Sequence, residues 1–331
     1  MCAYKVKWSD MDPSVRLIGW IYRKILPYSD EKLFRHQNRL LDRFIKGHWF
    51  SRQTRAETIT VKRPDGSDLR LLVCRARNHD NAGKNRTGLL WIHGGGYAVG
   101  LPEQDVLFTR MFCRDDSCIA VLPQYRRSLD APYPAALDDC YQALEWMWKH
   151  TEELGINRDQ IFVGGDSAGG GLTAALCLYA RDQGEIPIAF QMPLYPMIDD
   201  RQITASSQDN DAPVWNTKSN DLAWKLYLGD LHGKEVPAYA APSRAENLKG
   251  LPPVLTYVGT IEPFYDETKA FVEALKEAGV PVTFREFPGC FHGFDIIAYP
   301  AKAARSARKF LMENFRYAQE HYFASGYENK D

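Results

Sequence analysis

Residues 160–171 read QIFVGGDSAGGG and contain the strongest structural signal in the chain. An apolar, β-branched segment runs into a row of small residues, which is typical of a buried strand that turns sharply into a helix beginning near Ala168. Gly165 to Gly169 match G-x-S-x-G, in which the two outer glycines leave room for a strained serine turn. We therefore expect Ser167 to be a nucleophile exposed at a helix start, although the motif alone leaves a small-residue turn without chemistry open.

A second glycine-rich motif, HGGG at residues 93–96, follows the apolar run 87–93. Successive glycines let the backbone approach a substrate carbonyl, so the N–H groups of Gly95 and Gly96, with that of Ala168, could stabilise an oxyanion. A tight glycine turn, or a phosphate-binding loop without its lysine, is the alternative. We expect His93 to order this loop by hydrogen bonding.

The rest of the chain alternates short apolar runs with longer helical stretches, which predicts an α/β fold with a doubly wound, mostly parallel sheet of about eight strands. Asp65-Gly66, between two extended runs, predicts an antiparallel N-terminal hairpin. Besides the run already described, the strands are expected at 117–123, 160–165, 187–195, 252–259 and 280–287, and the helices at 135–150, 168–183, 267–278 and 301–322.

Two regions fall outside this alternation. Residues 1–55 show helical spacing without strand alternation, and the interval 200–240 contains a helical pattern with Trp224 and Tyr227. The interval is long enough to cover a site. We expect a catalytic domain formed by residues 56–199 and 241–331.

A base and an acid are also needed to activate a serine. His292, in GCFHGFD, follows the last expected strand and is the one histidine so placed. Past the strand at 252–259 lie three acidic residues, Glu262, Asp266 and Glu267, and Asp199 follows an earlier strand. The chain order serine, acid, histidine is that of α/β-hydrolases.

Together these motifs resemble the hormone-sensitive-lipase-like carboxylesterases, an α/β-hydrolase family with HGGG and GDSAG motifs. The resemblance covers roughly residues 57–320 and includes QYRRSLDAPYPAALDD, at 124–139, which is similar to the family's Y-R-x-A-P-E-x-x-[FY]-P-A-A-x-x-D segment. The chain has RRSLDAP where the family has R-L-A-P-E, so the role of the family's glutamate does not carry over.

The resemblance implies a serine esterase for short- to medium-chain acyl esters, with residues 1–55 and 200–240 forming a helical cap. Trp215, Trp224 and Tyr227 are candidate pocket walls, although aromatic residues at helical spacing are more often core. A serine peptidase or amidase, and a non-catalytic ligand-binding protein on the same fold, are the alternatives.

The family's acid loop reads D-P-L-x-D, which EPFYD matches with Glu262 in place of the first aspartate. Glu262 is therefore the expected triad acid and Asp266 the second choice. Asp266 and Glu267 are otherwise expected as first-turn charges of a helix, Asp266 as its N-terminal cap, and Asp199 as part of an ion pair with its neighbours.

Composition limits the partners. A formal net charge of −1 with dispersed charges predicts that the protein recruits neither nucleic acid nor an anionic membrane. Seven scattered cysteines without a Cys/His cluster predict reduced, mostly buried thiols and no metal site, and no motif predicts a cofactor. No apolar run has the length of a membrane span or the form of a signal peptide, so we expect a cytoplasmic protein. A homodimer remains open.

Overall fold

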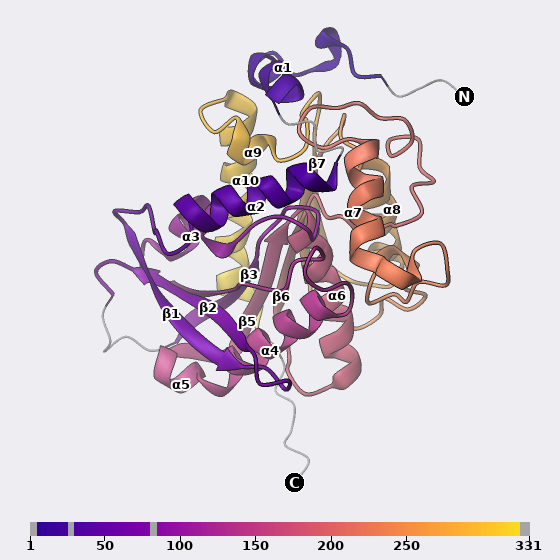
Figure 1. The fold of residues 1–331 in the computed structure, drawn as a ribbon. Helices are drawn as coiled ribbons and strands as arrows, with labels where there is room; N and C mark the ends of the chain where they lie inside the picture. The colour runs from indigo at the N-terminus through magenta and orange to yellow at the C-terminus, as the bar shows by residue number, and fades with distance from the viewer. Residues whose placement is uncertain (1–4, 26–29, 80–84, 325–331) are drawn as a thin grey trace.

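The computed structural model describes residues 5–25, 30–79 and 85–324. Within these ranges eight strands form one sheet in the order β1-β2-β4-β3-β5-β6-β7-β8 (Figure 1). β1 pairs antiparallel with β2, and β2 with β4, whereas all other neighbours are parallel. The predicted sheet and its antiparallel hairpin are confirmed. The strands are β1 (Thr54–Lys62), β2 (Asp68–Ala76), β3 (Arg86–Ile92), β4 (Cys118–Pro123), β5 (Ile156–Asp166), β6 (Phe190–Leu194), β7 (Val254–Gly259) and β8 (Val282–Phe287).

Helices cover both faces of the sheet. The α-helices are α1 (Arg16–Ile25), α2 (Glu31–Phe44), α3 (Val106–Cys113), α4 (Ala135–Lys149), α5 (Thr151–Leu154), α6 (Ala168–Gln183), α7 (Thr217–Leu228), α8 (Tyr265–Glu277), α9 (Phe294–Ile297) and α10 (Lys302–His321). Core residues of α4, α6 and α8 share one hydrophobic cluster, and those of α3 and α10 share another. The sheet therefore separates two cores, as a doubly wound fold requires.

β3 shows how one strand serves both cores. Leu90 and Ile92 belong to the cluster of α4 and α6, whereas Leu89 and Trp91 belong to that of α3 and α10. All four side chains are fully buried, because successive residues of a strand point to opposite faces of a sheet that is covered on both sides.

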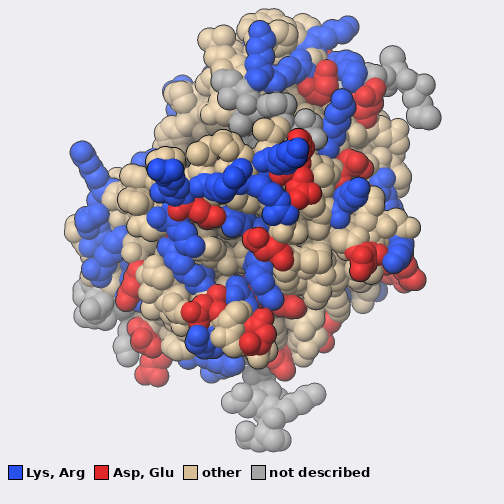
Figure 2. All heavy atoms as spheres, viewed as in Figure 1, with Lys and Arg blue, Asp and Glu red and all other residues tan. Residues whose placement is uncertain are grey.

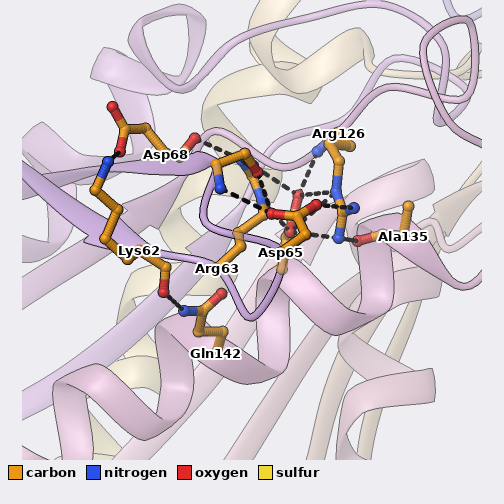
Figure 3. A network of polar contacts seen from close by, with 9 residues as sticks. Lys62, Arg63, Asp65, Asp68, Arg126, Ala135 and Gln142 are labelled. Atoms are coloured by element: carbon orange, nitrogen blue, oxygen red, sulfur yellow. Dashed lines mark hydrogen bonds and ion pairs between the residues drawn. The ribbon is translucent and has the colours of Figure 1, made fainter.

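The β1–β2 hairpin is tied to α4 by a buried ion cluster (Figure 3). The turn places Arg63 against α4, where its Nε lies 2.7 Å from the Asp139 carboxylate. Arg126 approaches the same carboxylate to 2.9 Å. Asp139 is 1% exposed, so two guanidinium groups replace the water that this carboxylate would otherwise need.

The structure differs from the expected elements in several places. β5 begins at Ile156, four residues before the expected start, and α3 and α9 were not expected. The N-terminal region forms α1 and α2, as its helical spacing predicted, but residues 1–4 and 26–29 lie outside the described part. No helix in the described part is apolar over a stretch long enough to cross a bilayer.

The six described cysteines are free and buried, which confirms the expectation of reduced, mostly buried thiols for them. Cys2 lies outside the described residues. Burial raises the pKa of the thiols of Cys74, Cys113, Cys140 and Cys177.

Parallel pairing brings the important loops to one edge. β3, β5, β7 and β8 run in the same direction, so the segments after their last residues gather at the carboxyl edge of the sheet. These segments contain HGGG, the serine turn, the acidic loop and the GCFHGFD loop.

Candidate active site

Ser167 occupies a sharp turn between β5 and α6. Its backbone has φ 57° and ψ −119°, a conformation that L-residues rarely adopt and that stores strain. Gly169 makes the turn possible, since a Cβ there would lie 2.0 Å from the carbonyl oxygen of Ile92. α6 therefore begins in close contact with β3, and Ser167 is held by backbone bonds to Leu194 and Met197.

Three side chains that the sequence singled out form one hydrogen-bonded row. His292 Nε2 lies 2.8 Å from Ser167 Oγ, and His292 Nδ1 lies 2.8 Å from Glu262 Oε1. The N–H of Gly259, at the end of β7, donates to the other Glu262 oxygen at 3.2 Å. Glu262 is fully buried and His292 is 5% exposed, so solvent competes little for these bonds. A serine whose hydroxyl faces an oriented imidazole can be activated for attack on a carbonyl.

Burial and the imidazole act on Glu262 in opposite directions. Loss of hydration raises the pKa of this carboxyl, whereas the charge of His292 and its hydrogen bond lower it, as does the Gly259 N–H. The carboxylate form of Glu262 therefore depends on the imidazole beside it.

The other acidic candidates lie apart from this row. Asp266, in the first turn of α8, accepts a hydrogen bond from the Ser206 N–H through Oδ2 at 2.8 Å. No side chain caps the N-terminus of α8, so the expected capping role of Asp266 is wrong. Glu267 lies in the first turn of α8 as expected, but it is buried and accepts from the Ile198 N–H at 3.1 Å. Asp199 pairs with Arg201 at 2.7 Å, which confirms the expected ion pair.

The HGGG loop passes close to Ser167. Gly95 has φ +121°, and a Cβ at this position would lie 1.9 Å from the carbonyl oxygen of Val99, so the loop requires glycine there. Among the described residues, the N–H groups of Gly95, Gly96 and Ala168 have no hydrogen-bond acceptor. Three donors are thus available beside the serine, where a carbonyl oxygen could gain negative charge.

His93 helps to hold the HGGG loop in place. Its Nδ1 donates to the carbonyl of Gly94 at 2.8 Å, and its ring stacks on Tyr125 with centroids 4.2 Å apart. Burial lowers the pKa of His93 to about 4, so the ring is neutral at neutral pH. The expected ordering role is consistent with these contacts.

A buried pair of carboxyl groups behind the serine was not anticipated. Asp166 Oδ1 accepts from the Gly94 N–H at 3.0 Å, and Asp105 Oδ2 accepts from Trp91 Nε1 at 2.8 Å. Burial raises the pKa of Asp105 to about 7 and, together with the charge of Asp105, raises that of Asp166 well above its usual range. The pair therefore holds at least one proton near neutral pH. The only signal for Asp105 was its position shortly after the glycine loop.

A cavity of about 220 Å³ opens onto the serine. Its apolar walls come from segments far apart in the sequence: Phe34 from α2, Val214 and Trp215 from the 200–240 interval, and Ile296 and Ile297 from α9. The rings of Phe34 and Trp215 stack with centroids 6.3 Å apart.

The other two candidate wall residues lie elsewhere. Trp224 and Tyr227 are buried against Tyr97 and do not line the cavity. The described side chains contain no group of three or more His, Cys, Asp or Glu residues that could hold a metal ion.

Comparison with known proteins agrees with this architecture. The family model described as alpha/beta hydrolase fold matches residues 89–296. The chain is 34% identical over 220 residues to Esterase LipI of Mycobacterium tuberculosis (strain ATCC 25618 / H37Rv), which covers 66% of this chain and 69% of the relative. It is also 34% identical over 225 residues to Carboxylesterase NlhH of the same strain, covering 66% of this chain and 70% of the relative.

A solved structure extends the similarity to nearly the whole chain. The bacterial heroin esterase superposes with a TM-score of 0.84 and 31% identity, covering 95% of this chain and 99% of that one. The matched residues 89–296 make up more than half of the chain and include HGGG, Ser167, Glu262 and His292. The chain therefore belongs to the alpha/beta hydrolase fold family, among its hormone-sensitive-lipase-like carboxylesterases.

Proposed function

We propose that this carboxylic ester hydrolase cleaves short- to medium-chain acyl esters through a Ser167–His292–Glu262 triad and an acyl-enzyme intermediate. The observation that carries the proposal is the row of two 2.8 Å hydrogen bonds from Glu262 through His292 to the serine hydroxyl. Each group has the role that its chemistry allows: nucleophile, proton acceptor, and carboxylate that orients the imidazole.

The reaction follows from this arrangement. Ser167 Oγ attacks the ester carbonyl while its proton passes to His292 Nε2, and the imidazolium is stabilised by Glu262. The N–H groups of Gly95, Gly96 and Ala168 hold the oxyanion. His292 then returns the proton to the leaving alcohol, and a water molecule, deprotonated by the same nitrogen, releases the acid and restores the serine.

The size of the cavity favours a short acyl group. Its volume of about 220 Å³ lies below the roughly 300 to 1,000 Å³ of pockets that take drug-sized ligands. Phe34 and Trp215 supply stacked aromatic walls, so small apolar acyl groups gain contact with them on binding.

We assign the walls to a cap made of residues 1–55 and 200–240, resting on a catalytic domain of residues 56–199 and 241–331. Contacts between the two cap segments and with the site support this division. Phe34 and Trp215 meet over the cavity, and Asn38 of α2 donates to the Ala98 carbonyl of the glycine loop at 2.9 Å.

Ser167→Ala tests the proposal. With p-nitrophenyl acetate, the turnover number should fall about a millionfold while the protein stays folded. Ser128→Ala is a matched control, because the buried Ser128 hydroxyl has no hydrogen-bond partner among the described residues, and its activity should be unchanged.

The peptidase alternative is tested on the same protein. Wild type should hydrolyse p-nitrophenyl acetate far faster than an aminoacyl anilide. Activity that survives in Ser167→Ala would refute the assigned nucleophile, and a preference for the anilide would refute the assigned substrate class.

A further inference from the structure

Exposed apolar side chains are concentrated in the N-terminal segment. The described residues expose eleven large apolar side chains, and eight of them lie between Trp8 and Phe50. Single exposed apolar residues are ordinary, but a cluster of them marks an interaction surface. The segment concerned includes the helix that walls the proposed acyl pocket.

α2 presents three distinct faces. Phe34 and Asn38 are buried toward the site. Leu33, Leu40 and Phe44 are 40%, 44% and 56% exposed, and their spacing of seven and four residues places them in one stripe along the helix. This second apolar stripe contributes nothing to the core, so folding alone does not account for it.

The third face is basic. Lys32, Arg39 and Arg43, followed by Lys46 just after the helix, recur at the same helical spacing and are all exposed. None of these four cations has an acidic partner in the part of the chain that the structure describes. Figure 2 shows a row of Lys and Arg side chains over α2. The net charge of −1 describes the whole chain and does not show this local excess of positive charge on α2.

The exposed stripe continues into the pocket. Gln37 lines the cavity, and it lies between Leu33 and Leu40, one helical turn from each. A surface in contact with this stripe would therefore lie at the mouth of the pocket.

α1 adds a second exposed apolar edge at the same end of the molecule (Figure 1). Leu17, Trp20 and Ile21 are 64%, 36% and 44% exposed at helical spacing. The opposite side of α1 is anchored next to the proposed base, because Gly19 contacts the ring of Phe291.

We propose that α2 docks the protein on an anionic lipid bilayer, with the mouth of the pocket turned toward the membrane. Helices that lie in a membrane interface typically have leucine and phenylalanine on one face and lysine and arginine on another, as α2 does. A second copy is a poorer occupant, since a two-fold interface would set the same unpaired cations against each other. We call Leu33, Leu40, Phe44, Lys32, Arg39, Arg43 and Lys46 the docking surface.

Vesicle co-sedimentation tests this proposal without any substrate. The full chain should bind vesicles of phosphatidylcholine with phosphatidylglycerol, and bind pure phosphatidylcholine much less. Raising the salt from about 0.1 M to about 1 M shortens the screening length from about 10 Å to about 3 Å and should release most of the protein.

Two double variants separate the charged and apolar contributions. Arg39→Gln with Arg43→Gln should weaken binding about 25-fold, since each cation near an anionic surface contributes about fivefold. Leu40→Ser with Phe44→Ser should weaken it by about tenfold or more, through lost apolar contact. None of these four side chains lines the cavity, so hydrolysis of soluble p-nitrophenyl acetate should not change.

Matched controls lie at the opposite edge of the sheet, where Ala324 bonds to Asp159 at the start of β5. Arg316→Gln, and Tyr317→Ser with Phe323→Ser, remove exposed groups of the same kinds from that region. These controls should bind vesicles like wild type.

Several outcomes would overturn the proposal: no binding to either vesicle, equal binding to both, or equal losses in the docking variants and the controls. A dimer in light scattering that the docking variants convert to monomer, without vesicle binding, would instead assign this face to a second copy. Because binding is measured without catalysis, its failure would leave the proposed hydrolysis untouched.

Discussion

Replacing Glu262 by glutamine removes one charge from the proposed triad and almost nothing else. Glutamine keeps the length of the side chain and can still accept the Gly259 N–H, which lies 3.2 Å away. What it loses is a buried negative charge 2.8 Å from Nδ1 of the imidazole ring, which becomes positively charged when Nε2 takes the serine proton.

The size of the effect follows from that geometry. Opposite unit charges about 4 Å apart at an effective dielectric constant of about 20 attract by roughly 4 kcal/mol. Each factor of ten in rate corresponds to about 1.36 kcal/mol, so the turnover number should fall about a thousandfold, with loss of the imidazole's orientation adding up to a further factor of about ten. The Michaelis constant should change little, because the missing interaction belongs to the transition state.

The assay is steady-state hydrolysis of p-nitrophenyl acetate, with the melting temperature measured in parallel. Glu267→Gln is the matched control: Glu267 is equally buried and lies five residues away, and burial raises its pKa well above the usual range. Burial thus favours the uncharged form of Glu267, and an amide should replace it with little effect on turnover. If Glu262→Gln keeps turnover within about tenfold of wild type, or if Asp266→Asn loses as much, the assignment of the acid is wrong.

Further predictions concern the buried groups around the site. Because burial raises the pKa of Asp105 to about 7, the native state binds more protons than the unfolded state between about pH 4 and pH 7. The free energy of unfolding should thus fall as pH rises through that window, and urea titrations of Asp105→Asn should show a flatter dependence. Gly95→Ala should lower turnover by about a hundredfold or more, since the added Cβ meets Val99 and displaces an oxyanion donor, whereas Gly47→Ala, also at positive φ but in open space, should not. Asp139→Asn should reduce the free energy of unfolding by about 3 kcal/mol in denaturant titrations, because it leaves the buried Arg63 and the half-buried Arg126 without their carboxylate.

The sequence predicted elements best where local pattern and burial agree. The expected helix at 168–183 matches α6 residue for residue, and the hairpin at Asp65-Gly66 is present with Lys62 opposite Asp68. In both places glycine and apolar spacing specify the backbone without reference to distant parts of the chain.

The side chains of α8 were harder to predict, because their surroundings come from other loops. Asp266 and Glu267 have the sequence of ordinary first-turn charges, yet their partners are Ser206 and Ile198, both about sixty residues or more away along the chain. Helical position is a local property, whereas the loop that covers a helix start is not. The buried Asp105 was missed for the same reason: only the folded loop brings it behind the serine.

The buried thiols can be used to follow local unfolding of the protein. A thiol reacts as its thiolate. A thiol that is buried and has a raised pKa is therefore protected from alkylating reagents and oxidants both by its surroundings and by its protonation. Cys113 is the last residue of α3, Cys177 lies in α6, and Cys290 lies in the loop that carries His292. In a Cys2→Ser background, the order in which brief pulses of a maleimide label these positions would map which layer of the molecule separates first, residue by residue and without any added probe.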